Sequence, residues 1–160
     1  MGPVPVGAVL AFPATVAPAG FIKYNGALLS RTAYPALWAY ANASGNIVSE
    51  ASWASGNAGA FSTGDLSTTF RIPDGRGEFF RGFDDSRGVD TGRTMGSQQG
   101  DLLKDHTHSY TSPAFGSGTG STPNYFFSSF GSATTGGMNG GLGGAATRPR
   151  NIRLLMCIKF

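Results

Sequence analysis

The chain has only two histidines, and they stand one residue apart in the stretch DHTHSYTS. These are His106 and His108, and no charged side chain follows Asp105 until Arg148. In an extended strand, residues i and i+2 point to the same side about 6.6 Å apart. Two imidazoles placed in this way can bind one transition-metal ion, since iron, zinc, nickel and copper all accept imidazole nitrogen. The spacing predicts metal binding, with exposed loop histidines as the alternative.

Two nitrogens are too few to complete a metal site. Structural zinc takes four ligands and octahedral ions take six. The chain has no third histidine, and Cys157 lies in the apolar run LLMCI, so a single chain would need carboxylates such as Asp101 or Asp105. Three chains around a threefold axis would instead supply six imidazole nitrogens. The ligand count therefore favours a metal shared by three copies.

The same residues offer little for catalysis. His-x-His opens several metallohydrolase motifs, but those sites draw on further ligands, and this chain has no other histidine. Ser109 and Asp105 flank the pair, yet there is no Gly-x-Ser-x-Gly motif. Carboxylate pairs for glycoside hydrolysis would have to be neighbouring aspartates, either Asp84 with Asp85 or Asp101 with Asp105. We predict that the protein is not an enzyme, and a metal-dependent polysaccharide hydrolase is the less favoured alternative.

Composition predicts a folded chain that is rich in strands and loops. Its 160 residues suit one domain or two small ones, with 13% charged and 40% hydrophobic residues, 25 glycines and 12 phenylalanines. Disordered chains show the reverse pattern of high charge and few aromatics. The net charge of +3 comes with no run of basic residues interleaved with aromatics, which argues against a nucleic-acid partner.

Targeting signals are also missing from the sequence. There is no apolar stretch of about 18 residues, as membrane insertion would require, and the start MGPVPVGAV has no positively charged region typical of a signal peptide. We therefore expect synthesis in the cytoplasm and release by lysis or within a particle. Cys157 is the only cysteine, and its apolar neighbours predict a buried side chain.

The first part of the chain predicts strands around one helix. The run PVGAVLAF is bounded by prolines, which suits an edge strand, and Asn25-Gly26 predicts a tight hairpin. Ser30 or Thr32 is expected to cap a helix with Pro35 in its first turn and an apolar stripe of Tyr34, Leu37, Trp38 and Ala41. Residues 42–64 are predicted as loop, anchored by Trp53 and Phe61. The C-terminal run predicts a docked strand with one apolar face: Ile152, Leu154, Met156 and Ile158.

The stretch TTFRIPDGRGEFFRGFDDSRG combines core and charge. Five apolar side chains are expected to fill a core: Phe70, Ile72, Phe79, Phe80 and Phe83. The Arg, Asp and Glu residues between them alternate in sign. They form either a solvated lattice of ion pairs, each contributing little, or pairs that cross between chains, where arginine forks fix the register.

Residues 107–147 contain Ser, Thr, Gly, Asn and aromatic side chains but no charge. A disordered linker is one interpretation. The number of aromatics favours an ordered, loop-rich tip, because rigid rings with small polar groups suit adaptable recognition. The candidate receptor-binding residues are Tyr110, Asn124, Tyr125, Phe126, Phe127 and Phe130, and the alternative for the rings is an oligomer core.

Three motifs follow one another along the chain: the turn GFIKYNG at 20–26, the helix start SRTAYPAL at 30–37, and FRIPDGRG at 70–77. In this order they resemble the phage tail-collar domain, over about residues 3–83. The later GSQQGDLLKDHTHSY and ATRPRNIRLLMCIKF also resemble fibres with such domains. The chain departs from the family in having Tyr24 where cysteine is frequent, and in having a single His-x-His copy.

The resemblance implies a homotrimeric tail-fibre tip of a contractile-tailed phage or an R-type bacteriocin. In related tips the His-x-His motifs of three chains bind an axial metal, which carries over to His106 and His108 alone. One ion per trimer is expected, iron first, with zinc or nickel as alternatives. The expected partners are two further copies, the rest of the tail fibre, and a bacterial surface polysaccharide or lipopolysaccharide.

The expected fold is thus β-rich α+β. A collar-like domain with one short helix spans residues 1–95, and a loop-rich, metal-binding and receptor-binding tip with a returning C-terminal strand spans 96–160, in an intertwined homotrimer. The chain would act outside the producing cell, at the fibre tip. A trimerisation and folding module without its own receptor site is the main alternative.

Overall fold

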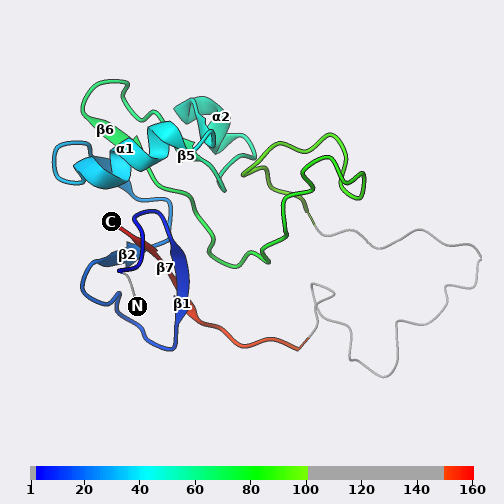
Figure 1. Ribbon diagram of the computed structural model, residues 1–160, viewed down its shortest axis with the longest axis horizontal. Coiled ribbons are helices and arrows are strands. Elements are labelled where there is room, and N and C mark those ends of the chain that lie inside the picture. The colour runs from blue at the N-terminus through cyan, green and yellow to red at the C-terminus, as the bar shows by residue number, and fades with distance from the viewer. Residues whose placement is uncertain (1–2, 101–149) are drawn as a thin grey trace, which may run out of the picture. The chain divides into compact units, whose positions relative to one another are not determined.

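The computed structural model describes residues 3–100 and 150–160, which belong to one compact unit. In these residues the fold is β-rich α+β, as expected, but it has two short helices where one was expected (Figure 1). The elements in chain order are β1 Val9–Phe12, β2 Phe21–Lys23, β3 Leu28–Ser30, α1 Pro35–Ala43, β4 Ile47–Val48, α2 Glu50–Ala54, β5 Phe61–Ser62, β6 Thr69–Arg71 and β7 Leu155–Lys159. No helix among the described residues is long and apolar enough to span a membrane.

The first sheet joins the two ends of the chain. Its strand order is β1-β7-β2, and both pairings are antiparallel. Ile158 on β7 lies opposite Val9 on one side and Ile22 on the other. The predicted edge position of β1 and the docked C-terminal strand are confirmed. The predicted apolar face is too long, because Ile152 and Leu154 are 88% and 42% exposed and both precede the strand.

The second sheet has the order β3-β6-β5-β4, with β4 and β5 parallel. Because β2 and β3 belong to different sheets, the hairpin predicted at Asn25-Gly26 is wrong. The turn itself is present: Gly26 has a φ of +70° and its N–H donates to the carbonyl of Pro73. Asn25 forms an isolated bridge with Asp74. The turn therefore passes the chain from one sheet to the next.

The predicted helix is present as α1. Leu37 and Ala41 are fully buried, and Tyr34 and Trp38 pack against the core, so the predicted stripe faces inward. Pro35 begins the helix, where its missing N–H costs little. The predicted cap is wrong, because Tyr34 is the N-cap residue and its side chain makes no capping bond. Ser30 instead accepts a hydrogen bond from the N–H of Ala33 in the preceding turn.

Residues 42–64 are not only loop, because they contain α2, β4 and β5. Ser49 caps α2 by accepting a hydrogen bond from the N–H of Ser52. Both predicted anchors are confirmed: Phe61 is 4% exposed, and the indole N–H of Trp53 donates to the carbonyl of Ala60 at 2.9 Å. Glu50 ties α2 to the second sheet, because it accepts hydrogen bonds from Ser62 on β5 and Arg71 on β6. The hydrogen bond from Arg71 contributes most to lowering the pKa of Glu50, and the bond from Ser62 lowers it further.

The core joins both sheets and α1. Its buried members are Leu37, Ala41, Phe61, Phe70, Ile72 and Ile158. Cys157 is also fully buried, as predicted, and this burial raises the pKa of its thiol. Five side chains of the stretch 70–83 were expected in the core, and for three of them the prediction is wrong. Phe79, Phe80 and Phe83 are 67%, 59% and 57% exposed. The chain leaves the second sheet after β6 and carries them along an irregular segment.

Candidate functional site

All the sequence-predicted site residues lie outside the described residues. This holds for the metal candidates His106 and His108, and for the receptor candidates Tyr110, Asn124, Tyr125, Phe126, Phe127 and Phe130. Among the residues that the structure describes, no group of three or more His, Cys, Asp or Glu side chains could hold a metal ion. The predicted metal and receptor sites therefore stay predictions.

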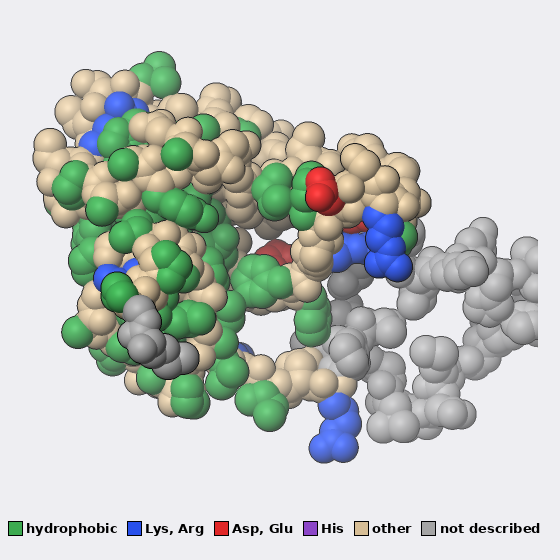
Figure 2. Space-filling model, viewed as in Figure 1, with side chains coloured by type: hydrophobic (Ala, Val, Ile, Leu, Met, Phe, Trp, Pro, Cys, Tyr) green, Lys and Arg blue, Asp and Glu red, His purple; other side chains and the backbone are tan. Residues whose placement is uncertain are grey.

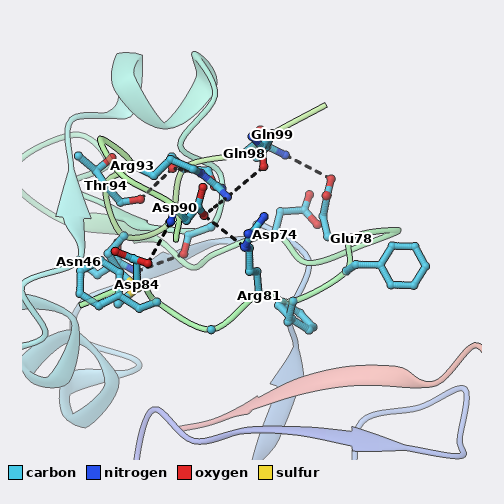
Figure 3. Close-up of a pocket in the computed structure, with 18 of the residues that line it drawn as sticks. Asn46, Asp74, Glu78, Arg81, Asp84, Asp90, Arg93, Thr94, Gln98 and Gln99 are labelled. Atoms are coloured by element: carbon cyan, nitrogen blue, oxygen red, sulfur yellow. Dashed lines mark hydrogen bonds and ion pairs between the residues drawn. The ribbon is translucent and has the colours of Figure 1, made fainter. Parts of the chain in front are cut away.

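The described unit has a hollow of about 520 Å³ that sequence reasoning missed (Figure 3). It is lined by parts of residues 76–99, which we name the 76–99 segment, together with Tyr24, Asn46, Gly59 and Asp74. These residues are far apart in the sequence. The one available signal was the alternation of charged side chains within the 76–99 segment.

Asp90 is the centre of the polar network in the hollow. Its carboxylate accepts from Nη1 of Arg93 at 2.9 Å and lies 3.4 Å from Nε of Arg81. Arg93 also donates to the carbonyl of Ser97 at 2.7 Å. Arg76, at the start of the segment, pairs with Asp74. Each of these arginines therefore has an acidic partner within its own chain, which agrees with the interpretation as a lattice of ion pairs.

Asp84 orders the turn that follows it. Its carboxylate accepts hydrogen bonds from the N–H groups of Gly88, Val89 and Asp90 at 2.8 to 3.0 Å. These bonds lower the pKa of Asp84, and the bond from the N–H of Gly88 contributes most. Asp85 and Ser86 take left-handed backbone angles, with φ of 44° and 68°. Asp84 is thus occupied in holding the turn.

Two titratable groups that line the hollow, Tyr24 and Asp74, keep fixed protonation states near neutral pH. Burial raises the pKa of Tyr24 to about 12, so its phenol stays neutral. The hydrogen bond from Arg76 lowers the pKa of Asp74, so that carboxyl stays charged. Asn46 donates to the carbonyl of Gly59 at 3.2 Å, while its buried Oδ1 has no partner among the described residues.

Residues 7–46, which span β1 to the residue before β4, match the family model of the Phage Tail Collar Domain. Over these residues the chain is similar to the phage tail collar domain. This domain holds β1, β2, β3 and α1, the part of the chain where the turn and helix motifs were found. The match supports the resemblance drawn from those two motifs.

Two curated relatives extend the comparison beyond the collar domain. The uncharacterized protein StfE of Escherichia coli is 38% identical over 104 residues, which cover 65% of this chain and 44% of StfE. Protein RhiB of Rhizobium leguminosarum bv. viciae is 34% identical over 157 residues, covering 88% of this chain and 64% of RhiB. The chain therefore spans less than two thirds of either relative. No solved structure matches it significantly.

Proposed function

We propose that the chain is the receptor-binding tip of the tail fibre of a phage or a phage-like bacteriocin, and that it acts outside the producing cell as a non-enzymatic homotrimer. The single observation that carries this proposal is the position of β7. It is the central strand between β1 and β2, which both lie in the collar domain. Residues 101–149 are therefore an insertion whose two flanks belong to one compact unit, residues 1–100 and 150–160, which we name the collar unit. Recognition segments are commonly carried in this way on a stable scaffold.

The inserted residues have the composition of a recognition surface for a bacterial polysaccharide or lipopolysaccharide. Rings at Tyr110, Tyr125, Phe126, Phe127 and Phe130 would stack on sugars, and the Asn124 amide would bond to their hydroxyls. Each tip can bind weakly, because several fibres that act together raise the overall affinity.

The donor chemistry of His106 and His108 fits a shared transition metal. Two imidazole nitrogens from each of three chains make six donors, which suits an octahedral ion such as iron, with zinc or nickel as alternatives. An ion bound only by the assembled trimer stabilises that assembly by mass action. The metal would thus act in assembly and would take no part in a reaction.

Native mass and elemental analysis of the purified chain test the trimer and the metal. We expect a trimer with one ion, which is one third of an ion per chain. His106→Ala and His108→Ala should each remove the ion. A monomeric wild-type chain contradicts the homotrimer, and one ion per chain or none contradicts the shared site.

Binding of the fluorescently labelled chain to cells of a susceptible strain tests the receptor role. We expect purified lipopolysaccharide of that strain to compete, and we expect Tyr125→Ala to bind less than Tyr40→Ala, a matched change in the collar domain. A trimer that binds no susceptible cell would favour the trimerisation and folding module. Release of reducing sugars from envelope glycan, abolished by His106→Ala, would establish the hydrolase instead.

A further inference from the structure

The 76–99 segment carries apolar side chains that its own described chain leaves open. Phe79, Phe80 and Phe83 are more than half exposed, and Val89 is 63% exposed. In Figure 2, hydrophobic side chains lie beside acidic and basic ones where Figure 1 draws this segment. Contiguous exposed apolar side chains with a polar rim are typical of a surface that meets another molecule.

The backbone of the same segment is open as well. Among the described residues, the N–H and C=O groups from Phe79 to Phe83 form no hydrogen bond. These residues belong to neither sheet. Unpaired backbone groups beside exposed phenylalanines can pair with a neighbouring chain in the manner of an exposed sheet edge.

Charge decides which neighbour suits this surface. The segment has four arginines and four acidic residues, Arg76, Arg81, Arg87 and Arg93 with Glu78, Asp84, Asp85 and Asp90. A balanced set of both signs can face a copy of itself, whereas nucleic acids and anionic membranes would require a positive excess. Residues 106–147 of the same chain hold no charge to pair with it. A second copy is therefore the occupant that the charges favour.

The apolar area is compatible with that occupant. At roughly 200 Å² for a whole phenylalanine side chain, the exposed parts of the three rings amount to on the order of 350 Å². A stable interface buries about 800 Å² of each partner. The rings would form the apolar centre, and the charged residues of the segment would form the rim.

We propose that the 76–99 segment is the surface through which the collar units of neighbouring copies associate. This inference rests on the proposed homotrimer and names the residues that join it. Phe79, Phe80 and Phe83 make the apolar contact. Exposed charged residues such as Arg87 and Asp85 pair with opposite charges of the neighbouring copy and set the register.

Thiol shielding in the full-length chain tests this surface. Cys157 is fully buried, so an introduced surface cysteine gives the main signal. Gly82 suits the test because a Cβ atom there would meet nothing within 4 Å among the described residues. Thr15, exposed between β1 and β2, is the matched control. We expect the thiol of Gly82→Cys to react roughly tenfold more slowly with a chromogenic reagent than that of Thr15→Cys.

The outcomes separate this inference from the homotrimer on which it rests. A monomeric wild-type chain contradicts the homotrimer itself. A trimeric chain in which both thiols react equally fast overturns only the surface proposed here. Shielding that persists after dilution to monomers also overturns it, because the cover would then be the chain's own residues. A Gly82→Cys chain that no longer assembles, while Thr15→Cys does, supports the surface.

A second pair of variants tests the same surface by native mass. Phe79→Ser combined with Phe83→Ser removes the apolar centre, and Leu66→Ser is the control because Leu66 is 75% exposed outside the segment. We expect the control to remain trimeric and the double variant to dissociate at concentrations where the control does not. Equal masses for the two would overturn the assignment.

Discussion

Arg31 lies over the ring of Trp38, with its guanidinium carbon 4.0 Å from the ring centroid. From there it donates hydrogen bonds to the carbonyls of Thr63, Leu66 and Thr69, at 2.8, 3.2 and 2.9 Å. These three residues belong to the connection between β5 and β6 and to the first residue of β6. One side chain thus ties this connection to α1.

Replacement of Arg31 should destabilise the collar unit. We expect Arg31→Ala to lower the free energy of unfolding by about 2 to 3 kcal/mol, because it removes three charge-assisted hydrogen bonds and the stacking on Trp38. Arg31→Lys should recover little, since an ammonium cannot reach three carbonyls in a planar fork. Urea unfolding measures both. Arg153→Ala, an exposed arginine before β7, should stay within about 0.5 kcal/mol of wild type.

The sequence predicted best the elements that depend on local patterns. The apolar stripe of α1 placed Leu37 and Ala41 in the core, and the prolines around β1 indicated an edge strand. The Ser49 cap and Glu50 in the first turn of α2 were a signal of the same local kind, and it was overlooked within a Ser- and Gly-rich stretch.

The pairing of strands that are distant in the chain could not be predicted from local sequence patterns. A turn at Asn25-Gly26 looks the same whether its flanking strands pair with each other or enter two sheets, and only the pairing of β2 with β7 decides. For the same reason Phe79 was predicted as core although its hydrophobicity is equally suited to an interface. The hollow brings together residues as distant in the sequence as Asn46 and Gly96, which no spacing rule connects.

Leu66 offers a route to higher stability. It has a φ of 67° and its side chain is 75% exposed, so it has left-handed backbone strain and little packing in its own chain. We expect Leu66→Asn to raise the free energy of unfolding by about 0.5 to 1 kcal/mol, because asparagine tolerates this conformation. Val16→Asn, at a similarly exposed site without positive φ, should give no gain in urea unfolding. A loss at position 66 would show that the leucine side chain contacts something in the assembly.

Asp65 should make stability depend on acid pH. Its carboxylate accepts hydrogen bonds from the hydroxyl of Thr68 and from the N–H groups of Ser67, Thr68 and Thr69. These bonds hold the pKa of Asp65 well below its usual range, and the Thr68 hydroxyl contributes most. The unfolded chain therefore takes up a proton near pH 3.9 that the folded chain does not. The stabilisation is complete at neutral pH and is lost as pH falls below about 4.

Asp65→Asn cannot titrate and should lose less stability than wild type between about pH 5 and pH 2. Thr68→Val removes the largest cause of the lowered pKa and should reduce the dependence in the same direction. Unfolding free energies measured in urea across this pH range test both variants. Parallel curves for wild type and Asp65→Asn would contradict the assigned role of these hydrogen bonds.

A hydrogen bond between two glycines, Gly59 and Gly96, fastens the 76–99 segment to the chain just before β5. The N–H of Gly59 donates to the carbonyl of Gly96 at 2.9 Å, and Gly96 has a φ of +76°. A Cβ atom at Gly96 would lie 2.6 Å from the nitrogen of Ala60, closer than packed atoms approach. Gly96→Ala should therefore detach this end of the segment, and trypsin should cleave after Arg81, Arg87 and Arg93 roughly tenfold faster than in wild type.

Gly88→Ala is the control that distinguishes the steric clash at Gly96 from the backbone strain of a positive φ. Gly88 has a φ of +85°, but a Cβ atom there would meet nothing within 4 Å in residues 3–100 and 150–160. Both alanines are strained by positive φ, whereas only Gly96→Ala also forces two backbone segments apart. Cleavage should thus rise much more for Gly96→Ala than for Gly88→Ala when both are compared at equal oligomeric mass. Equal rates for the two variants would mean that the Gly59–Gly96 contact does not hold the segment in place.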